Sequence, residues 1–263
     1  MKKNVLNLMA IIMMAFVCVG FFSCGDDDDE EERNSNNPVP AVTSAKVGDI
    51  YYSDGTCSTV LASGKTPIGI VVYVGNDSVS EYKHGLVMAL NNSGQEQMYH
   101  APNTYYNYTA GTMEEAISDM KGLEKTKALA EIQYDAAVNA LNYNVQVPSG
   151  TTGWFIPSIG QWIAVLNNFG AGITKELGFK VFTGGSDLLA NINNTLEKTG
   201  TEGVDYTSLS SRTGSGQAGY FWSSSFCSRV GIWDVVFNVE SGVYLNPSGN
   251  IFSSLYIRPF LAF

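Results

Sequence analysis

The sequence predicts an α+β domain with strands towards both ends and helices in the middle of the chain. Segments rich in β-branched and aromatic residues occur between residues 48 and 90 and return after residue 219. Between residues 112 and 196, apolar residues recur at the three- and four-residue spacing of helices. Because strands and helices are segregated along the chain, we expect α+β architecture, with the terminal strands side by side in one sheet.

The first strands are predicted before residue 91. Residues 48–56 read GDIYYSDGT, and the pair Asp54-Gly55 favours the tight turn of a β-hairpin. Residues 67–74, PIGIVVYV, and residues 85–90, GLVMAL, have the composition of buried strands. The domain is therefore expected to open with a hairpin and two core strands.

Capping signals predict where the helices begin. Thr112 and Glu115 fit a capping box at the start of the first helix, and residues 128–141 carry the apolar stripe of a second helical stretch. Ser158 follows a short strand and can cap a third helix over residues 159–166. The apolar stripes of these helices are expected to pack in the core.

The last helix is predicted over residues 186–196, and strands follow to the end of the chain. Trp233, Val235 and Phe237 alternate as residues on one core face of a strand should. Residues 247–249, PSG, are typical of a turn.

The first 23 residues are predicted to be a lipoprotein signal peptide. A short basic start, Met1-Lys2-Lys3, precedes an apolar run that is too short for a stable membrane span. The run ends in FFSC, which resembles a bacterial lipobox with Cys24 as the lipidated residue. Cleavage before Cys24 would make the lipid-bearing cysteine the new N-terminus. The alternative is an uncleaved anchor helix with an ordinary cysteine at its end.

Residues 24–41 are predicted to form a lipidated acidic tether. Seven consecutive acidic residues follow Gly25, and their like charges repel with nothing apolar to bury. An acidic run after a lipidated cysteine resembles the surface-export signal of Bacteroidetes lipoproteins, which implies the outer membrane and the cell surface. Residues 42–263 are then long enough to form one domain with a sizeable core.

Charge and cysteine content limit the expected partners. The chain carries a formal net charge of −10 and shows no cluster of Lys and Arg, so nucleic acid and anionic membrane surfaces are not expected partners. The membrane is expected to be reached through the lipid anchor. Cys57 and Cys227 remain in the mature domain, where an oxidising compartment leaves two alternatives, a disulfide or two unpaired thiols.

Motifs for catalysis and metal binding are weak. Residues 214–219 match G-x-G-x-x-G, but a dinucleotide site needs a strand before this motif and a helix after it, whereas here it leads into a strand. His84 and His100 are the only histidines, and neither has the spacing of zinc ligands. We therefore expect no metal, no cofactor and no enzymatic activity. Asp234 and Glu240 are the best carboxylates that an enzyme acting on polysaccharides could use.

The C-terminal segment breaks the strand pattern. Between the core positions stand residues that no periodicity explains, several of them apolar and on the face opposite the predicted core. Exposed apolar and aromatic side chains at this density favour a binding patch. The alternative is that a loop of the same chain or a partner subunit covers them. The predicted ligand-binding residues are Phe226, Cys227, Ser228, Arg229, Val230, Ile232, Asp234, Val236, Tyr244, Asn246, Ser248, Asn250, Phe252 and Leu255.

Several motifs resemble a known family. They are VGDIYYSDGT, PIGIVVYV, GWFIPSIGQW, FWSSS and the ending YIRPFLAF. Together they are similar to bacterial domains of the C-type-lectin-like or formylglycine-generating-enzyme-like fold, including Bacteroides proteins diversified by diversity-generating retroelements. The resemblance covers most of residues 42–263. It implies a C-type-lectin-like fold whose C-terminal strands and loops form a ligand-binding face with rewritten codons, so that Cys227 would be a diversified side chain.

Two departures from the family limit what is carried over. Formylglycine-generating enzymes use a pair of reactive cysteines, and Cys227 is the only cysteine in the C-terminal region. Calcium-dependent lectins use an E-P-N or Q-P-D loop with W-N-D, whereas this chain has Asn246-Pro247-Ser248 and Trp233-Asp234-Val235. Neither that catalytic activity nor a calcium-dependent sugar site is therefore implied.

The sequence leaves three functions open. The first is a cell-surface lipoprotein that binds an extracellular protein or glycan through its C-terminal face. The second is a minor or tip subunit of a fimbrial adhesin, with other fimbrial subunits as partners. The third, for which no convergent acid, base or metal cluster is visible, is a carbohydrate-active enzyme.

Overall fold

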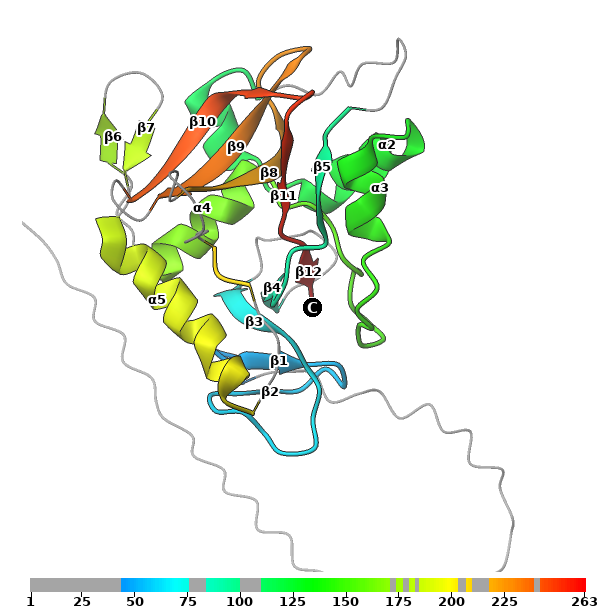
Figure 1. The fold of residues 1–263 in the computed structure, drawn as a ribbon, viewed down its shortest axis with the longest axis vertical. Coiled ribbons are helices and arrows are strands. Elements are labelled where there is room, and N and C mark those ends of the chain that lie inside the picture. The colour runs from blue at the N-terminus through cyan, green and yellow to red at the C-terminus, as the bar shows by residue number, and fades with distance from the viewer. Residues whose placement is uncertain are drawn as a thin grey trace, which may run out of the picture. The chain divides into compact units, whose positions relative to one another are not determined.

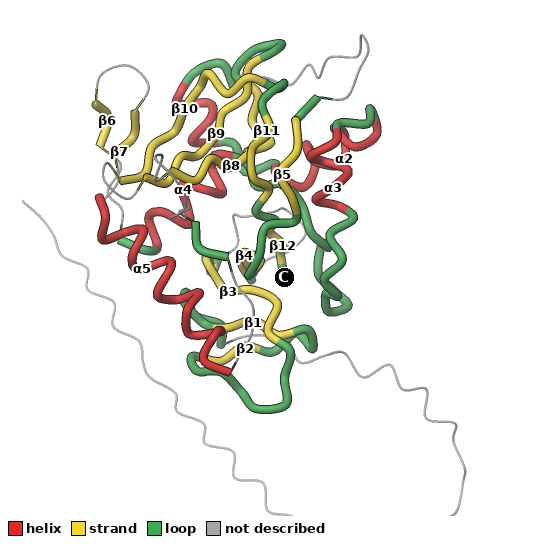
Figure 2. The backbone as a smooth tube through the Cα atoms, viewed as in Figure 1, coloured by secondary structure: helices red, strands yellow, loops and turns green. Residues whose placement is uncertain are grey.

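The computed structural model describes residues 44–75, 84–99, 110–170, 174–176, 180–182, 185–202, 207–209, 218–238 and 242–263. The chain divides into two units, Met1–Pro38 and Val39–Phe263, and all described residues belong to the second. The predicted signal peptide, Cys24 and the predicted tether lie outside the described residues. The second unit combines helices with antiparallel-rich sheets, which confirms the predicted α+β class (Figure 2).

One five-stranded sheet contains both the first and the last strand (Figure 1). Its order is β12-β4-β3-β1-β2, and neighbouring strands are antiparallel. The strands are β1 (Ile50–Tyr52), β2 (Cys57–Ser58), β3 (Pro67–Val74), β4 (Gly85–Ala89) and β12 (Phe260–Ala262). The terminal strands share a sheet as predicted, but they are not side by side because β3 and β4 separate them. The predicted hairpin joins β1 to β2, with Gly55 in the turn at a φ of 84°.

The second five-stranded sheet is built mainly from C-terminal strands, in the order β10-β9-β8-β11-β5. Its members are β5 (Gly94–Gln97), β8 (Ala218–Phe226), β9 (Gly231–Asn238), β10 (Gly242–Asn250) and β11 (Ser254–Ile257), and only the β8–β11 pair is parallel. The sequence GQEQ of β5 is polar and gave no strand signal. A two-stranded hairpin, β6 (Thr174–Glu176) and β7 (Lys180–Phe182), lies beside β10 in Figure 1.

Two of the helices begin directly after the predicted caps Thr112 and Ser158. The helices are α1 (Met113–Ser118), α2 (Gly122–Glu131), α3 (Asp135–Leu141), α4 (Ile159–Asn168) and α5 (Gly185–Glu197), which continues into a 3-10 turn, η1 (Lys198–Glu202). Capping boxes from Thr112 with Glu115 and from Ser158 with Gln161 are both present. The continuous helix predicted over residues 128–141 is wrong, because Gln133 adopts a φ of 62° between α2 and α3. The short strand expected before Ser158 is reduced to one bridge, between Phe155 and Phe260.

Helix α4 lies between the two sheets and joins their cores. The ring of Trp162 is 4.9 Å from that of Phe260 on β12, and 6.0 Å and 5.7 Å from those of Phe221 and Phe237 on the second sheet. All four rings are buried, and such tilted and edge-on contacts are favourable beyond the area they bury. The predicted core positions Trp233, Val235 and Phe237 face this cluster.

Helices α2 and α3 cover part of the opposite face of the second sheet. Leu129 and Tyr134 from this helix pair form a separate buried cluster with Trp222, Phe226 and Ile232. The second sheet is therefore covered on both faces where these helices lie. This arrangement decides which of the predicted ligand-binding residues can reach a partner.

Candidate binding surface

Two turns of the second sheet lie side by side at one end of the domain. Residues 227–230 connect β8 to β9, and residues 251–253 connect β10 to β11; both appear at the top of Figure 1. The amide of Ile251 donates a hydrogen bond to the carbonyl of Val230 at 3.5 Å. Residues of the two turns can therefore contact the same partner.

These turns expose two large apolar side chains. Val230 and Phe252 are each 47% exposed, although most large apolar residues described in the second sheet are buried. The neighbouring polar side chains Ser228, Arg229 and Asn250 are also exposed. We name these five residues, all of them predicted as ligand-binding, the turn surface. Apolar side chains exposed together within a polar rim are typical of interaction sites.

Local contacts hold the first turn in one conformation. The amides of Cys227 and Ser228 both donate to the carbonyl of Gly231, at 3.1 and 3.2 Å. A Cβ atom at Gly231 would lie 2.7 Å from the Ser228 hydroxyl oxygen, so the turn closes around a residue without a side chain. The thiol of Cys227 donates to the carbonyl of Pro247, which ties the turn to β10.

An aromatic contact supports the second turn. The ring of Phe252 packs edge-on against Tyr99, with centroids 4.9 Å apart, and Tyr99 packs edge-on against the buried Tyr134 of α3's N-cap. The amide of Phe252 donates to the Asn250 side chain at 3.0 Å. Tyr99 is not among the residues predicted from the sequence, because it stands next to a polar strand that has no apolar alternation.

Four of the predicted ligand-binding side chains are buried, so the expectation that they are exposed is wrong. Phe226 and Ile232 pack under α2 and α3. Val236 has no exposed surface. It lies on β9, and its cross-strand partners are Tyr220 on β8 and Tyr244 on β10. Asp234, which is 2% exposed, is the fourth buried side chain.

The remaining members of the predicted set lie on β10 and β11. Tyr244, Asn246 and Leu255 are half-buried, and the side chain of Ser248 lies outside the described residues. The turn predicted at residues 247–249 is wrong, because β10 runs through this segment with a bulge between Asn246 and Gly249. Cys227 is half-buried with its thiol directed to β10, and among the predicted residues whose side chains the structure describes, only the five of the turn surface are exposed.

Asp234 is an ionisable group in an apolar setting. Burial raises the pKa of its carboxyl to about 7, and a hydrogen bond from the Asn246 amide, 3.2 Å long, opposes that rise. The second carboxyl oxygen has no hydrogen-bond partner within the described part of the chain. A buried carboxyl in this environment favours its neutral form near neutral pH.

The two cysteines of the domain do not form a disulfide; both are free thiols. Burial raises the pKa of Cys57 to about 11 and also raises the pKa of Cys227. Since the thiolate is the reactive form, both groups are poor nucleophiles at neutral pH.

The described residues contain no cluster of three or more His, Cys, Asp and Glu side chains that could hold a metal ion. Residues 214–217 of the G-x-G-x-x-G segment lie outside the described residues, and its last two residues already begin β8, so a strand and not a helix follows the motif. Glu240 also lies outside the described residues, and Asp234 is buried. In the part of the chain that the structure describes, no helix is both long and apolar enough to cross a bilayer.

Comparisons with known proteins give one informative likeness. No protein-family model matches the chain, and no curated protein sequence matches it. Among solved structures, the chain is similar to a fimbrial protein from Bacteroides ovatus ATCC 8483, with a TM-score of 0.51 and 18% sequence identity. The match covers 83% of this chain and 49% of that chain, so this chain spans about half the length of the fimbrial protein. The likeness concerns the fold.

Proposed function

We propose that this protein is a minor or tip subunit of a fimbrial adhesin, displayed at the cell surface. The observation that carries the proposal is the fold-level likeness to the Bacteroides ovatus fimbrial protein over most of this chain. Because one fold can serve several functions, the likeness supports the proposal and experiment has to test it. The predicted lipoprotein signal and acidic tether agree with a surface location, and an enzymatic role is not part of the proposal.

The turn surface is the proposed contact with a neighbouring subunit. Val230 and Phe252 stand on adjacent turns, and each would bury its exposed part against a partner. Apolar burial contributes about 25 cal/mol for each Å² removed from water, so two such anchors within a polar rim can form the centre of an interface. The hydrogen bonds within the turns limit the entropy lost on docking.

The test compares two double variants in the native host. Val230→Ser with Phe252→Ser removes the apolar anchors, and Val60→Ser with Val74→Ser is the matched control, because those valines, one in the loop after β2 and one at the end of β3, are 72% and 44% exposed. The proposal expects the first variant to reach the surface but to be lost from sheared fimbriae, and the control to be retained. Retention of both variants in fimbriae would contradict the assigned contact.

A second candidate function is a surface lipoprotein that binds an extracellular protein or glycan through the same turn surface. It is favoured by the exposure of Val230 and Phe252 together with Ser228, Arg229 and Asn250, all within the set that the family resemblance marks as diversified. A C-type-lectin-like fold and retroelement-driven diversification belong to this proposal. Sequencing the locus across one lineage tests it: changes concentrated in turn-surface codons would support diversification, and an even distribution would contradict it.

A further inference from the structure

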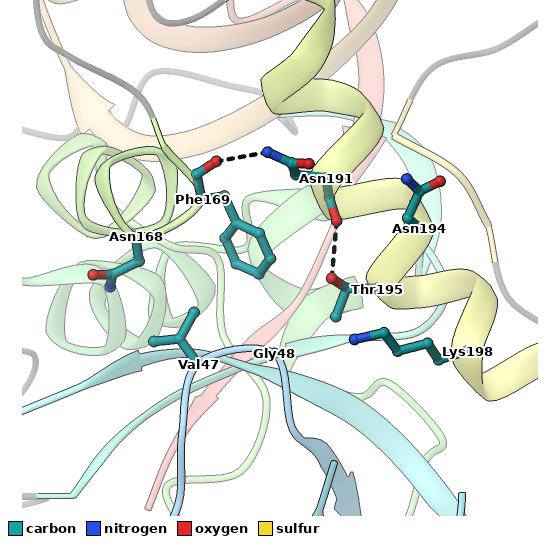
Figure 3. Close-up of a pocket in the computed structure, with 8 residues that line it drawn as sticks. All are labelled: Val47, Gly48, Asn168, Phe169, Asn191, Asn194, Thr195 and Lys198. Carbon is teal, nitrogen blue, oxygen red and sulfur yellow. Dashed lines mark hydrogen bonds between the residues drawn. The ribbon is translucent and has the colours of Figure 1, made fainter. Parts of the chain in front are cut away.

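A hollow of about 400 Å³ lies between the end of α4, the last turns of α5 and the segment before β1 (Figure 3). Its walls come from Asn168 and Phe169 at the end of α4, from Asn191, Asn194, Thr195 and Lys198 along α5 and η1, and from Val47 and Gly48. This volume lies within the range of small-molecule sites. The turn surface contributes none of the lining residues.

One face of α5 supplies most of the wall. Asn194 and Thr195 stand three and four residues after Asn191, and Lys198 stands four and three residues after them, so the four residues form a stripe along the helix and its continuation. A second stripe of the helix is buried in the core and consists of Leu188, Leu189, Ile192 and Leu196. The core stripe fixes the rotation of α5 and thereby places the polar stripe beside the hollow, where Figure 3 shows Asn191 and Thr195 next to Phe169.

Hydrogen bonds to the main chain hold the polar side chains in place. The Asn168 amide donates to the carbonyl of Val72 at 3.1 Å, and the Asn191 amide donates to the carbonyl of Phe169 at 3.3 Å. The hydroxyl of Thr195 donates to the Asn191 carbonyl at 2.8 Å. These side chains are therefore ordered before any ligand arrives, which lowers the entropy cost of binding.

The floor of the hollow is apolar and lies close to the backbone before β1. The ring of Phe169 is only 8% exposed and lies at the centre of the hollow in Figure 3, near Val47. Gly48 has a φ of 88°, and a Cβ there would lie 3.9 Å from the Thr195 methyl carbon. A residue with a side chain would be strained at this position, so glycine keeps this side of the hollow open.

The charge of the lining differs from that of the whole chain. None of the eight lining residues, all in the part of the chain that the structure describes, is acidic, and Lys198 is the basic one among them, whereas the chain has a net charge of −10. Figure 3 shows the Lys198 ammonium directed towards Thr195 and Gly48. A small ligand carrying one negative charge fits this lining better than a neutral or cationic one.

The three lining amides can both donate and accept hydrogen bonds, and the Thr195 hydroxyl, which donates to the Asn191 carbonyl, can still accept one, as a ligand rich in hydroxyl groups requires. The apolar floor suits the C–H face of a sugar ring, and the lysine suits a carboxylate. We propose that this hollow binds an acidic monosaccharide of the hexuronate type, as the end unit of a glycan. The proposal deepens the proposed adhesin function by naming a ligand class, and it rests on that function only for its biological meaning.

The experiment titrates sodium glucuronate and methyl glucoside into the purified full chain and follows binding by calorimetry or ligand-observed NMR. We expect saturable glucuronate binding at or below ~10 mM and weaker binding of the neutral glucoside. Lys198→Gln should weaken glucuronate binding about tenfold or more, because it removes a charge-assisted contact. Asn194→Ala should weaken both sugars. Lys127→Gln, on the exposed side of α2, is the matched control and should bind as the wild type does.

Absence of glucuronate binding, equal affinity for the two sugars, or unchanged affinity of Lys198→Gln would overturn the proposal. Both Lys198 and Asn194 are exposed, so the variants should keep the fold, and circular dichroism checks this. The binding measurement uses the purified chain and does not depend on assembly into fimbriae. A chain that assembles into fimbriae but does not bind glucuronate would contradict this inference alone. A chain that binds glucuronate but never enters fimbriae would contradict the proposed function alone.

Discussion

The hydroxyl of Ser225 on β8 donates a hydrogen bond to the carboxylate of Asp119, a residue 106 positions earlier in the chain. The same hydroxyl accepts a bond from the amide of Ile159 at 3.0 Å, and Asp119 also forms a buried ion pair with Lys125. The α1–α2 connection, the start of α4 and the second sheet are thus joined at one polar centre. The serines of the FWSSS motif are buried and structural.

Removal of the carboxylate from this centre should destabilise the domain strongly. In Asp119→Ala, the buried ammonium of Lys125 loses its partner, and an uncompensated buried charge costs about 3 kcal/mol or more. Urea unfolding followed by tryptophan fluorescence measures the change. Glu124→Ala is the control, since its pair with Lys121 is exposed and should contribute less than about 1 kcal/mol. Equal stability of the two variants would show that the centre does not hold the fold together.

Gly160→Ala should also destabilise the domain, because α4 begins in close contact with the end of α1. A Cβ at this position would lie 2.7 Å from the carbonyl oxygen of Ile117, and backbone cannot move aside as a flexible side chain can. We expect a loss of about 2 kcal/mol or more in the free energy of unfolding. Gly111→Ala, where the nearest atom would be 3.7 Å away, should change stability little. A Gly160→Ala variant as stable as Gly111→Ala would contradict the close packing.

Asp234 should make stability fall as the pH rises. Its pKa is about 7 in the folded chain against an ordinary value of 3.8, so between these values the folded state holds a proton that the unfolded state has released. The stabilisation that the protonated Asp234 gives the folded state is fully present below pH ~4. It is lost as the pH rises to ~7, at about 1.4 kcal/mol per pH unit. Asp234→Asn should lack this slope, so the difference in unfolding free energy between the two proteins should change with pH. A constant difference from pH 4 to 8 would disprove the raised pKa.

The buried Arg258 should resist even conservative replacement. Its guanidinium donates to the carbonyls of Ala89, Leu90 and Thr207 at 2.6 to 2.9 Å and lies 6.0 Å from the Phe221 ring centre. A lysine cannot reproduce this fork, so Arg258→Lys should lower the free energy of unfolding by about 2 kcal/mol, measured by thermal denaturation. The control is Arg229→Lys, because Arg229 is exposed, whereas Arg212 lies outside the described residues. Equal melting temperatures for the two variants would count against the structural role of Arg258.

Local signals in the sequence predicted local structure well. The hairpin at Gly55 and the helix starts at Thr112 and Ser158 follow from turn and cap chemistry within a few residues. The break at Gln133 has no such signal, because a non-glycine residue there adopts a positive φ that tertiary packing has to hold.

The binding surface was predicted only in part, for a physical reason. Alternation along β9 separates Trp233 and Val235 from Ile232 and Asp234, but it cannot show that α2 and α3 cover the second face as well. The turn residues Val230 and Phe252, in contrast, are exposed as the sequence predicted. The hollow lined by Asn168, Asn191 and Lys198 was missed, since ordinary polar residues from distant segments form it and none belongs to a motif.

The measurement that tests the central claim most directly is mass spectrometry of fimbriae sheared from the native host and purified by density. The account predicts that this chain co-purifies with the filaments as a minor component, and that crosslinks join residues near Val230 and Phe252 to another subunit. Sheared filaments that lack the chain, while the same cells display it on their surface, would contradict the fimbrial assignment and leave the surface-lipoprotein function as the better account.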